Sequence, residues 1–280
     1  MSRRFLLQAP RLTVEKQRMQ LRNRYLLLAV IFFLASAGML LLQFGGGYMA
    51  AFGILQQFTQ QILSDTVWMW LTRFGDERIL LVLTLLFARR RPDIFWAIMV
   101  TAVIGGLFSR GIKINVDALR PPAILGEELL HLVGPALKSH SFPSGHTLST
   151  FIFCGVLFVY TTGRYKQLAL LLLAGLIALS RVALGVHWPI DLLGGAATGL
   201  MAAVLGTWVV SAWQAGLRPR VHLALLIVPL LAMIALLSGD DGNPHAPLLV
   251  GAVIGIALLK ALYDYRDLFV SSRKSENGVA

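Results

Sequence analysis

The sequence predicts an all-α protein, a polytopic transmembrane helical bundle. Of its 280 residues, 56% are hydrophobic and only 14% are charged, whereas soluble domains carry about a quarter charged residues. Long apolar runs recur along the chain, and several approach the roughly 20 residues that a membrane-spanning helix needs. Lys and Arg gather between alternate runs, as expected for loops that remain on one side of a membrane.

Eight apolar segments are expected to cross the membrane. They cover residues 25–44, 74–88, 94–112, 146–162, 168–185, 189–210, 223–238 and 246–263. The second segment is the weakest, because its continuous apolar part, Ile79 to Ala88, is short. The first is expected to be an uncleaved span, since its apolar run continues past the small residues at Ala35 to Ala37. The predicted organisation is a basic tail (1–24), a core of six spans (25–211), two additional spans (212–263) and a second tail (264–280).

The distribution of basic residues predicts the orientation. With the N-terminus in the cytoplasm, eighteen of the 25 Lys and Arg residues fall on the cytoplasmic side, which predicts that both termini lie there. The net charge of +11 is therefore interpreted as loop charge of a plasma (inner) membrane protein, and no nucleic-acid partner is expected. Three polar segments then share the extracytoplasmic face: Lys113–Pro122, Ser139–His146 and Ser180–Asp191.

Three cations in these segments predict a pocket for a polyanion. Lys113, Arg120 and Arg181 lie at or near predicted span ends, and charges there are costly unless they are paired or functional. An arginine can hold two phosphate oxygens at once. Ser144 and Gly145 precede an apolar helix, whose free N–H groups favour phosphate.

The reacting groups are expected in the same segments. Asp191 falls in the first turn of a span, close to His187, and a carboxylate that accepts one imidazole N–H leaves the other ring nitrogen free to attack. A second histidine, His146, is placed to protonate a leaving group. The segments lack a cluster of carboxylates that would hold magnesium, so no metal and no cofactor is expected.

These residues resemble the type 2 phosphatidic acid phosphatase family, whose motifs are KxxxxxxRP, PSGH and SRxxxxxHxxxD. The chain matches all three in order: Lys113 to Pro121, Pro143 to His146, and Ser180 to Asp191. The resemblance covers about residues 50–211 and implies a six-helix phosphatase core, which leaves the last two spans as additions. It implies that His187 becomes a phosphohistidine, that Asp191 orients it and that His146 is the general acid. The phosphate would be held by Lys113, Arg120, Ser144, Gly145 and Arg181.

The resemblance implies a lipid phosphate or diphosphate as substrate. Undecaprenyl diphosphate, phosphatidylglycerol phosphate, phosphatidate and lipid A phosphates remain candidates, because the motifs contact only the phosphate. Two alternatives remain open: a phosphotransferase that passes the phosphate to a lipid acceptor, and a transporter with a polyanion site between its helices. The oligomeric state is not predicted.

Two local expectations concern the surroundings of these motifs. Residues 123–138 are expected to form a short interfacial helix. Trp188, beside His187, is expected to be an aromatic anchor at the membrane interface.

Overall fold

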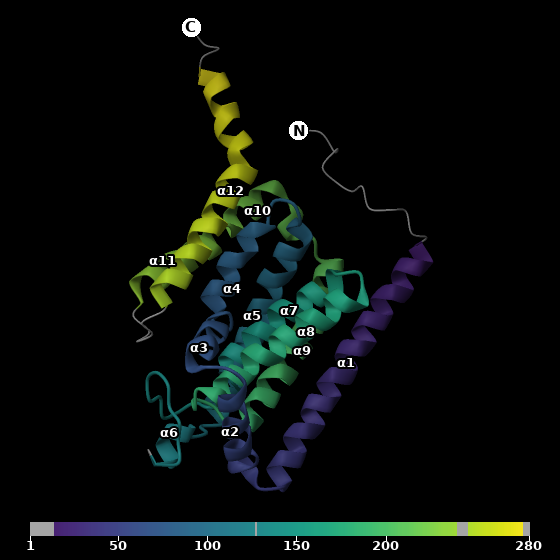
Figure 1. Ribbon diagram of the computed structural model, residues 1–280. Coiled ribbons are helices and arrows are strands. Elements are labelled where there is room, and N and C mark those ends of the chain that lie inside the picture. The colour runs from purple at the N-terminus through teal and green to yellow at the C-terminus, as the bar shows by residue number, and fades with distance from the viewer. Residues whose placement is uncertain (1–13, 127, 240–245, 277–280) are drawn as a thin grey trace.

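The computed structural model describes residues 14–126, 128–239 and 246–276, and most of these residues are helical (Figure 1). Parts of the two predicted tails, residues 1–13 and 277–280, lie outside these ranges. The α-helices in chain order are α1 (Val14–Phe44), α2 (Phe52–Ile62), α3 (Asp65–Arg73), α4 (Glu77–Leu83), α5 (Pro92–Asn115), α6 (Pro121–Ile124), α7 (Gly145–Tyr160), α8 (Arg164–Ala183), α9 (Pro189–Ala212), α10 (Pro219–Leu225), α11 (Ile227–Ser238) and α12 (Ala246–Glu276). The 3₁₀ turns are η2 (Gly47–Met49), η3 (Thr84–Leu86) and η4 (Ala215–Leu217). The predicted all-α fold is confirmed.

Within the described residues, six helical segments are long and apolar enough to cross a membrane. They are Met19–Phe44, Pro92–Asn115, Arg164–Ala183, Pro189–Ala212, Pro219–Ser238 and Pro247–Asp267. The α7 helix is also apolar but has only 16 residues, a rise of about 24 Å. These segments correspond to the predicted spans other than the second, and the chain is a multi-pass membrane protein.

The second predicted span, residues 74–88, is wrong as a continuous helix. Asp76 caps α4 by accepting the Arg78 N–H at 2.8 Å, and α4 tightens into η3 after seven residues. The helix begins only after the charged turn and ends before Arg89, so the apolar run between these points is too short for a span. In Figure 1, α3 and α4 follow one another along one side of the bundle.

The centre of the bundle is α9, which packs against α7, α1 and α5. Glycines on α9 allow the backbones of α7 and α9 to approach closely. A Cβ added to Gly195 would lie 2.7 Å from the Ser144 carbonyl oxygen, and one added to Gly199 would lie 2.7 Å from that of Leu148. Small residues at helix interfaces are a common device for close packing in membranes. The close packing fixes the ends of these two helices relative to one another.

The two additional helices cover α4. Their buried apolar side chains and those of α4 and η3 form one cluster: Ile79, Val82, Leu85, Ala232, Met233, Leu236, Val250, Val253 and Ala257. The α12 helix also joins the link before α5 by ion pairs, Arg89 to Asp267 at 2.6 Å and Arg90 to Asp264 at 3.4 Å. Helices α11 and α12 therefore complete the burial of the short α4.

Residues 123–126 and 128–138 do not form the expected interfacial helix, and residue 127 lies outside the described residues. The helix α6 ends at Ile124, and an irregular segment follows, in which Gly134 has a positive φ of 99°. Side chains and loops bind its backbone instead: Gln56 Nε2 donates to the His131 carbonyl at 2.8 Å, and Val133 N–H donates to Leu184 at 3.1 Å. This segment lies with α2 at the end of the bundle opposite the start of α1 and the end of α12 (Figure 1).

Candidate active site

The three motifs meet at one end of the bundle. Lys113 lies in the last turn of α5, and Arg120 lies just before α6. His146 lies in the first turn of α7, Arg181 in the last turn of α8 and Asp191 in the first turn of α9. Antiparallel neighbouring helices bring these turns to the same end, which also carries the link that contains His187.

His187 and Asp191 form a buried pair. The His187 side chain is 2% exposed and that of Asp191 is 0% exposed, and His187 Nδ1 lies 3.2 Å from Asp191 Oδ2. Because an ionised carboxylate accepts hydrogen bonds, this contact assigns the proton to Nδ1 and leaves the Nε2 lone pair free. The pair spans one helical turn of sequence, since Pro189 starts α9 between the two residues.

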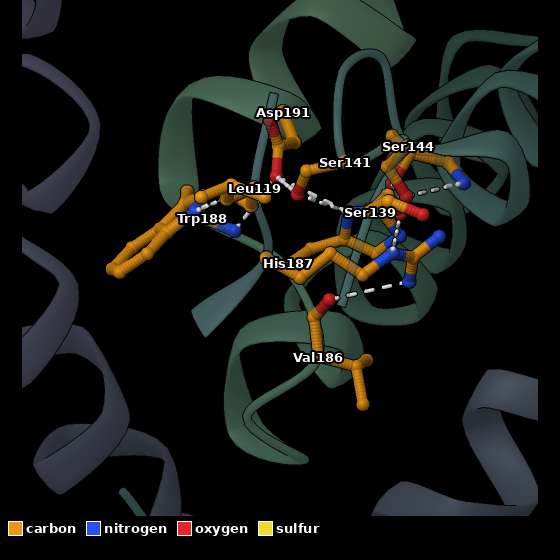
Figure 2. Close-up of polar contacts among 10 residues, drawn as sticks. Leu119, Ser139, Ser141, Ser144, Val186, His187, Trp188 and Asp191 are labelled. Carbon is orange, nitrogen blue, oxygen red and sulfur yellow. Dashed lines mark hydrogen bonds and ion pairs between the residues drawn. The ribbon is translucent and has the colours of Figure 1, made fainter. Parts of the chain in front are cut away.

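Two further groups hold the Asp191 carboxylate, as Figure 2 shows. The Ser141 hydroxyl donates to Asp191 Oδ2 at 2.5 Å, and the Trp188 N–H donates to the same oxygen at 2.9 Å. The second contact is the half of a capping box in which an acidic residue binds the N–H of the cap. Ser141 is completely buried and also lies 3.4 Å from His187 Nδ1. The motifs do not include Ser141, and no sequence signal singled it out.

Trp188 is not an interfacial anchor. Its side chain is 0% exposed, its Nε1–H donates to the Leu119 carbonyl at 2.8 Å, and its ring packs edge to face against Phe52. The aromatic ring therefore belongs to the packing beneath the motif loops. The hydrogen bond from Trp188 to Leu119 joins the third motif to the first.

Arg120 is buried and is fixed by backbone carbonyls. Its Nε–H donates to Ser139 at 2.9 Å and its guanidinium to Val186 at 3.3 Å, while its own N–H donates to Lys138 at 3.0 Å. Carbonyl oxygens carry no net charge, so they orient the guanidinium without neutralising it. The positive charge of Arg120 therefore remains free to act on the nearby His187.

Several cations act on His187. Burial and then the positive charges of Arg120 and Arg181 lower the pKa of His187 well below its ordinary value, with smaller contributions from His146 and Lys113. All four of these side chains therefore lie close enough to affect one imidazole. A lowered pKa keeps His187 neutral, the form in which a histidine is nucleophilic.

The start of α7 has the features of an anion site. Ser144 is its N-cap, and its hydroxyl oxygen accepts the Thr147 hydroxyl at 3.1 Å. Gly145 follows without a side chain, and a Cβ added there would lie 3.8 Å from Lys113 Nζ. The Lys113 ammonium therefore faces the first turn of a helix, whose free N–H groups attract anions.

Arg181 is buried at the end of α8, and its terminal nitrogen donates to the Thr72 hydroxyl at 2.7 Å. Within the described part of the chain, its Nε–H has no hydrogen-bond partner. The guanidinium therefore retains donor capacity inside the site.

A cavity of about 690 Å³ opens beside the cationic end. Lys113, Gly145 and His140 line it at the motif end, and Glu77, Ser109, Arg110 and Ser149 add polar groups. Most of the other lining side chains are apolar residues of α4, α5 and α7, among them Leu80 and Ile152. The Lys113 ammonium thus borders a largely apolar space. His140, which lies in no motif, is exposed and has a positive φ of 54°.

Among the residues that the structure describes, no group of three or more His, Cys, Asp or Glu side chains is placed to hold a metal ion. The donors around His187 are instead the positively charged side chains described above.

Comparisons with known proteins agree with the motifs. The model of the PAP2 superfamily matches residues 93–215. The "Undecaprenyl-diphosphatase" of Sulfolobus acidocaldarius is 27% identical over 158 residues, which are 55% of this chain and 71% of that protein. The "Lipid A 1-phosphatase" of Porphyromonas gingivalis is 32% identical over 111 residues, which are 39% of this chain but only 22% of that protein.

A solved structure is also similar. The crystal structure of Aquifex aeolicus LpxE aligns with a TM-score of 0.49 at 25% identity, covering 54% of this chain and 92% of that one. Residues 93–215 therefore match the PAP2 superfamily, and the same part of the chain carries the complete set of three phosphatase motifs.

Proposed function

We propose that this protein is an integral-membrane phosphatase that removes phosphate from a lipid phosphate or diphosphate through a phosphohistidine on His187, without a metal ion. The observation that carries the proposal is the buried pair of His187 Nδ1 and Asp191 Oδ2, 3.2 Å apart, on which the charges of Arg120, Arg181 and Lys113 act. The contact with Asp191 directs Nε2 of His187 away from the carboxylate. A phosphorus atom held by the cations would lie in front of that nitrogen.

In the first step, the Nε2 lone pair of His187 attacks phosphorus. A phosphorus–nitrogen bond forms as the bond to the leaving oxygen breaks, and that oxygen takes a proton from His146. Arg120, Arg181 and Lys113 stabilise the charge on the three remaining phosphate oxygens. Positioned cations are the principal means of catalysing phosphoryl transfer.

In the second step, His146 is neutral and takes a proton from a water molecule. The water oxygen attacks phosphorus, the phosphorus–nitrogen bond breaks, and inorganic phosphate is released. His187 regains its lone pair while Asp191 still holds its Nδ1–H. The helix start at Ser144 and Gly145 binds the phosphate oxygens through both steps.

The cavity supports a lipid as the phosphate carrier. A hydrocarbon chain leaving the phosphate near Lys113 would lie among the apolar side chains of α5 and α7, where burial of apolar surface favours binding. Undecaprenyl diphosphate, phosphatidylglycerol phosphate and phosphatidate fit this description. The names of the Sulfolobus and Porphyromonas relatives, an undecaprenyl-diphosphatase and a lipid A 1-phosphatase, place undecaprenyl diphosphate and lipid A first in a substrate panel.

We also propose that the site faces the extracytoplasmic side of the inner membrane and that both termini are cytoplasmic. The support is the excess of Lys and Arg at the other end of the bundle. In a Cys154→Ala background, an impermeant thiol reagent applied to intact cells should label Lys138→Cys and leave Lys166→Cys unlabelled. The reverse pattern would overturn the orientation.

The activity is tested by phosphate release from lipid candidates in detergent, with a chelator present throughout. His187→Gln should abolish release, whereas His222→Gln should retain it. His222 is a buried residue of α10, a helix at the end of the bundle opposite α2 and α6 (Figure 1). Loss of the wild-type activity in chelator, or full activity in His187→Gln, contradicts the mechanism. Labelled lipid phosphate also separates a hydrolase from a phosphotransferase, because transfer would move the label to a second lipid.

A further inference from the structure

Residues 72–76, which end α3 and lead to the start of α4, lie outside all three motifs and outside the region matched by the family model. They nevertheless contact two of the residues expected to handle the phosphate, Arg181 and His146. We name this segment the α3–α4 turn.

The first contact fixes Arg181. Its terminal nitrogen donates to the Thr72 hydroxyl at 2.7 Å, and the Thr72 and Arg181 residues are 7% and 9% exposed. In such a dry environment a hydrogen bond to a charged group is strong and directional. The Arg181 Nε–H is buried and has no partner among the described residues, so the Thr72 bond is the contact that sets the plane of the guanidinium.

The second contact lies behind His146. The Ser149 hydroxyl, one turn further along α7, donates to the Gly75 carbonyl at 2.5 Å. A Cβ added to Gly75 would lie 2.9 Å from His146 Cβ and 3.1 Å from its Cδ2. The glycine backbone therefore packs directly on the imidazole and restricts the directions in which the ring can point.

The α3–α4 turn is itself held from outside the motif region. Asp76 forms an ion pair with Arg78 at 2.6 Å, and Arg78 donates to the Ala235 carbonyl of α11 at 3.4 Å. The apolar cluster of α4, α11 and α12 holds the rest of the helix that follows the turn. Helices α11 and α12 thereby support the segment that contacts Arg181 and His146.

We propose that the α3–α4 turn is a fourth segment of the active site, and that Thr72 is a positioning residue which orients the Arg181 guanidinium toward the transferring phosphoryl group. The inference rests on the proposed function for what Arg181 binds. The hydroxyl group of Thr72, and not the size of the side chain, orients the guanidinium.

The test compares Thr72→Val, which keeps the shape and removes the hydroxyl, with Thr72→Ser, which keeps the hydroxyl. Thr101→Val is the matched control, because Thr101 is completely buried and its hydroxyl makes no hydrogen bond in the described part of the chain. Thr72→Val should lower kcat about ten-fold with a smaller change in KM, since loss of one charge-assisted hydrogen bond is expected mainly to weaken the transition state. Thr72→Ser should recover most of kcat, and Thr101→Val should match the wild type.

Orthovanadate, which resembles a phosphoryl group during transfer, provides a readout that needs no turnover. It should raise the Tm of the wild type and of Thr72→Ser, and it should raise that of Thr72→Val much less. This result would support the positioning role even if none of the lipids in the panel released phosphate, which would count against the proposed function alone.

Three outcomes would overturn the inference. Thr72→Val could retain the wild-type kcat and vanadate response, Thr72→Ser could be as impaired as Thr72→Val, or the loss of kcat could equal the loss of folded protein measured by size exclusion.

Discussion

Replacing Ser141 by alanine would remove the shortest of the three hydrogen bonds to Asp191 Oδ2, which measure 2.5, 2.9 and 3.2 Å. The other carboxylate oxygen has no partner among the described residues, and the whole side chain is buried. The carboxylate would then depend on the Trp188 N–H and the His187 ring alone. A hydrogen bond to a charged group contributes about 1.5–3 kcal/mol, so we expect a loss of stability of that order.

The same change should slow catalysis, because Ser141 helps to hold the carboxylate that orients His187. If about 1.4 kcal/mol of the loss appears in the transition state, kcat falls about ten-fold. The assay measures phosphate release in detergent at saturating lipid, together with Tm. Thr207→Val is the control, since it removes a buried hydroxyl that donates only to carbonyls of its own helix, Ala203 and Val204, at 2.6 and 3.1 Å.

The reasoning would be refuted if Ser141→Ala kept both its kcat and its Tm at the wild-type values. It would also fail if Thr207→Val lost as much activity as Ser141→Ala, because hydroxyl deletion anywhere in the bundle would then explain the effect.

Three other predictions follow from the geometry. Because burial and the nearby Arg120 lower the pKa of His187, the neutral nucleophile persists into mild acid, so the acid limb of kcat/KM assigned to this residue should lie below about pH 6.5. Gly75→Ala, whose Cβ would lie 2.9 Å from that of His146, should displace the imidazole and lower kcat by about an order of magnitude or more, measured by phosphate release. Gly195→Ala, whose Cβ would lie 2.7 Å from the Ser144 carbonyl, should force α7 and α9 apart and lower the free energy of unfolding by about 1–3 kcal/mol.

The two glycine predictions share a control, and each of the three predictions has a result that would contradict it. Gly251→Ala serves both glycine changes, because nothing lies within 4 Å of a Cβ added there, and it should leave Tm and kcat unchanged. An acid limb of kcat/KM that lies above pH 6.5 would contradict the lowered pKa of His187. A Gly75→Ala protein with normal kcat, or a Gly195→Ala protein with normal Tm, would contradict these predictions. It would show that the neighbouring atoms can move to accommodate the added Cβ without loss of activity or stability.

The positions of the motif residues could be predicted because polar groups are rare in this chain. Lys113, Arg120 and Arg181 stand out in an apolar sequence, and the charge distribution placed them at one end before any contact was known. The structure brings them together around His187, whose pKa is lowered by their charges. The roles of these residues in the reaction remain predictions.

The roles of other residues at the site could not be predicted from the sequence, for physical reasons. Ser141 and Thr72 belong to residue types that are common everywhere, and only tertiary packing gives each its partner, Asp191 or Arg181. Trp188 was misread because aromatic residues near span ends usually anchor at the interface, whereas here the indole fills a space between two motifs. Hydropathy identifies apolar content, but it does not show where a helix tightens into a 3₁₀ turn.

The prediction of a second span was wrong for a related reason, because hydropathy does not show what covers an apolar segment. An apolar run of about ten residues can be buried by lipid or by protein, and the sequence does not distinguish these partners. In this chain α11 and α12 cover α4, so a short helix is stable where an isolated one would not be. The two predicted additional spans, α11 and α12, thus bury the short α4, a role that the sequence did not predict.

The wall formed by the α3–α4 turn has a consequence for reasoning by homology. The family model begins at residue 93, and the wall that contacts Arg181 and His146 ends before it. A relative can therefore share every motif residue and differ throughout the segment that aims two of them. Activity inferred from the motifs alone therefore concerns the bond that is broken, and it does not take account of the segment that contacts Arg181 and His146.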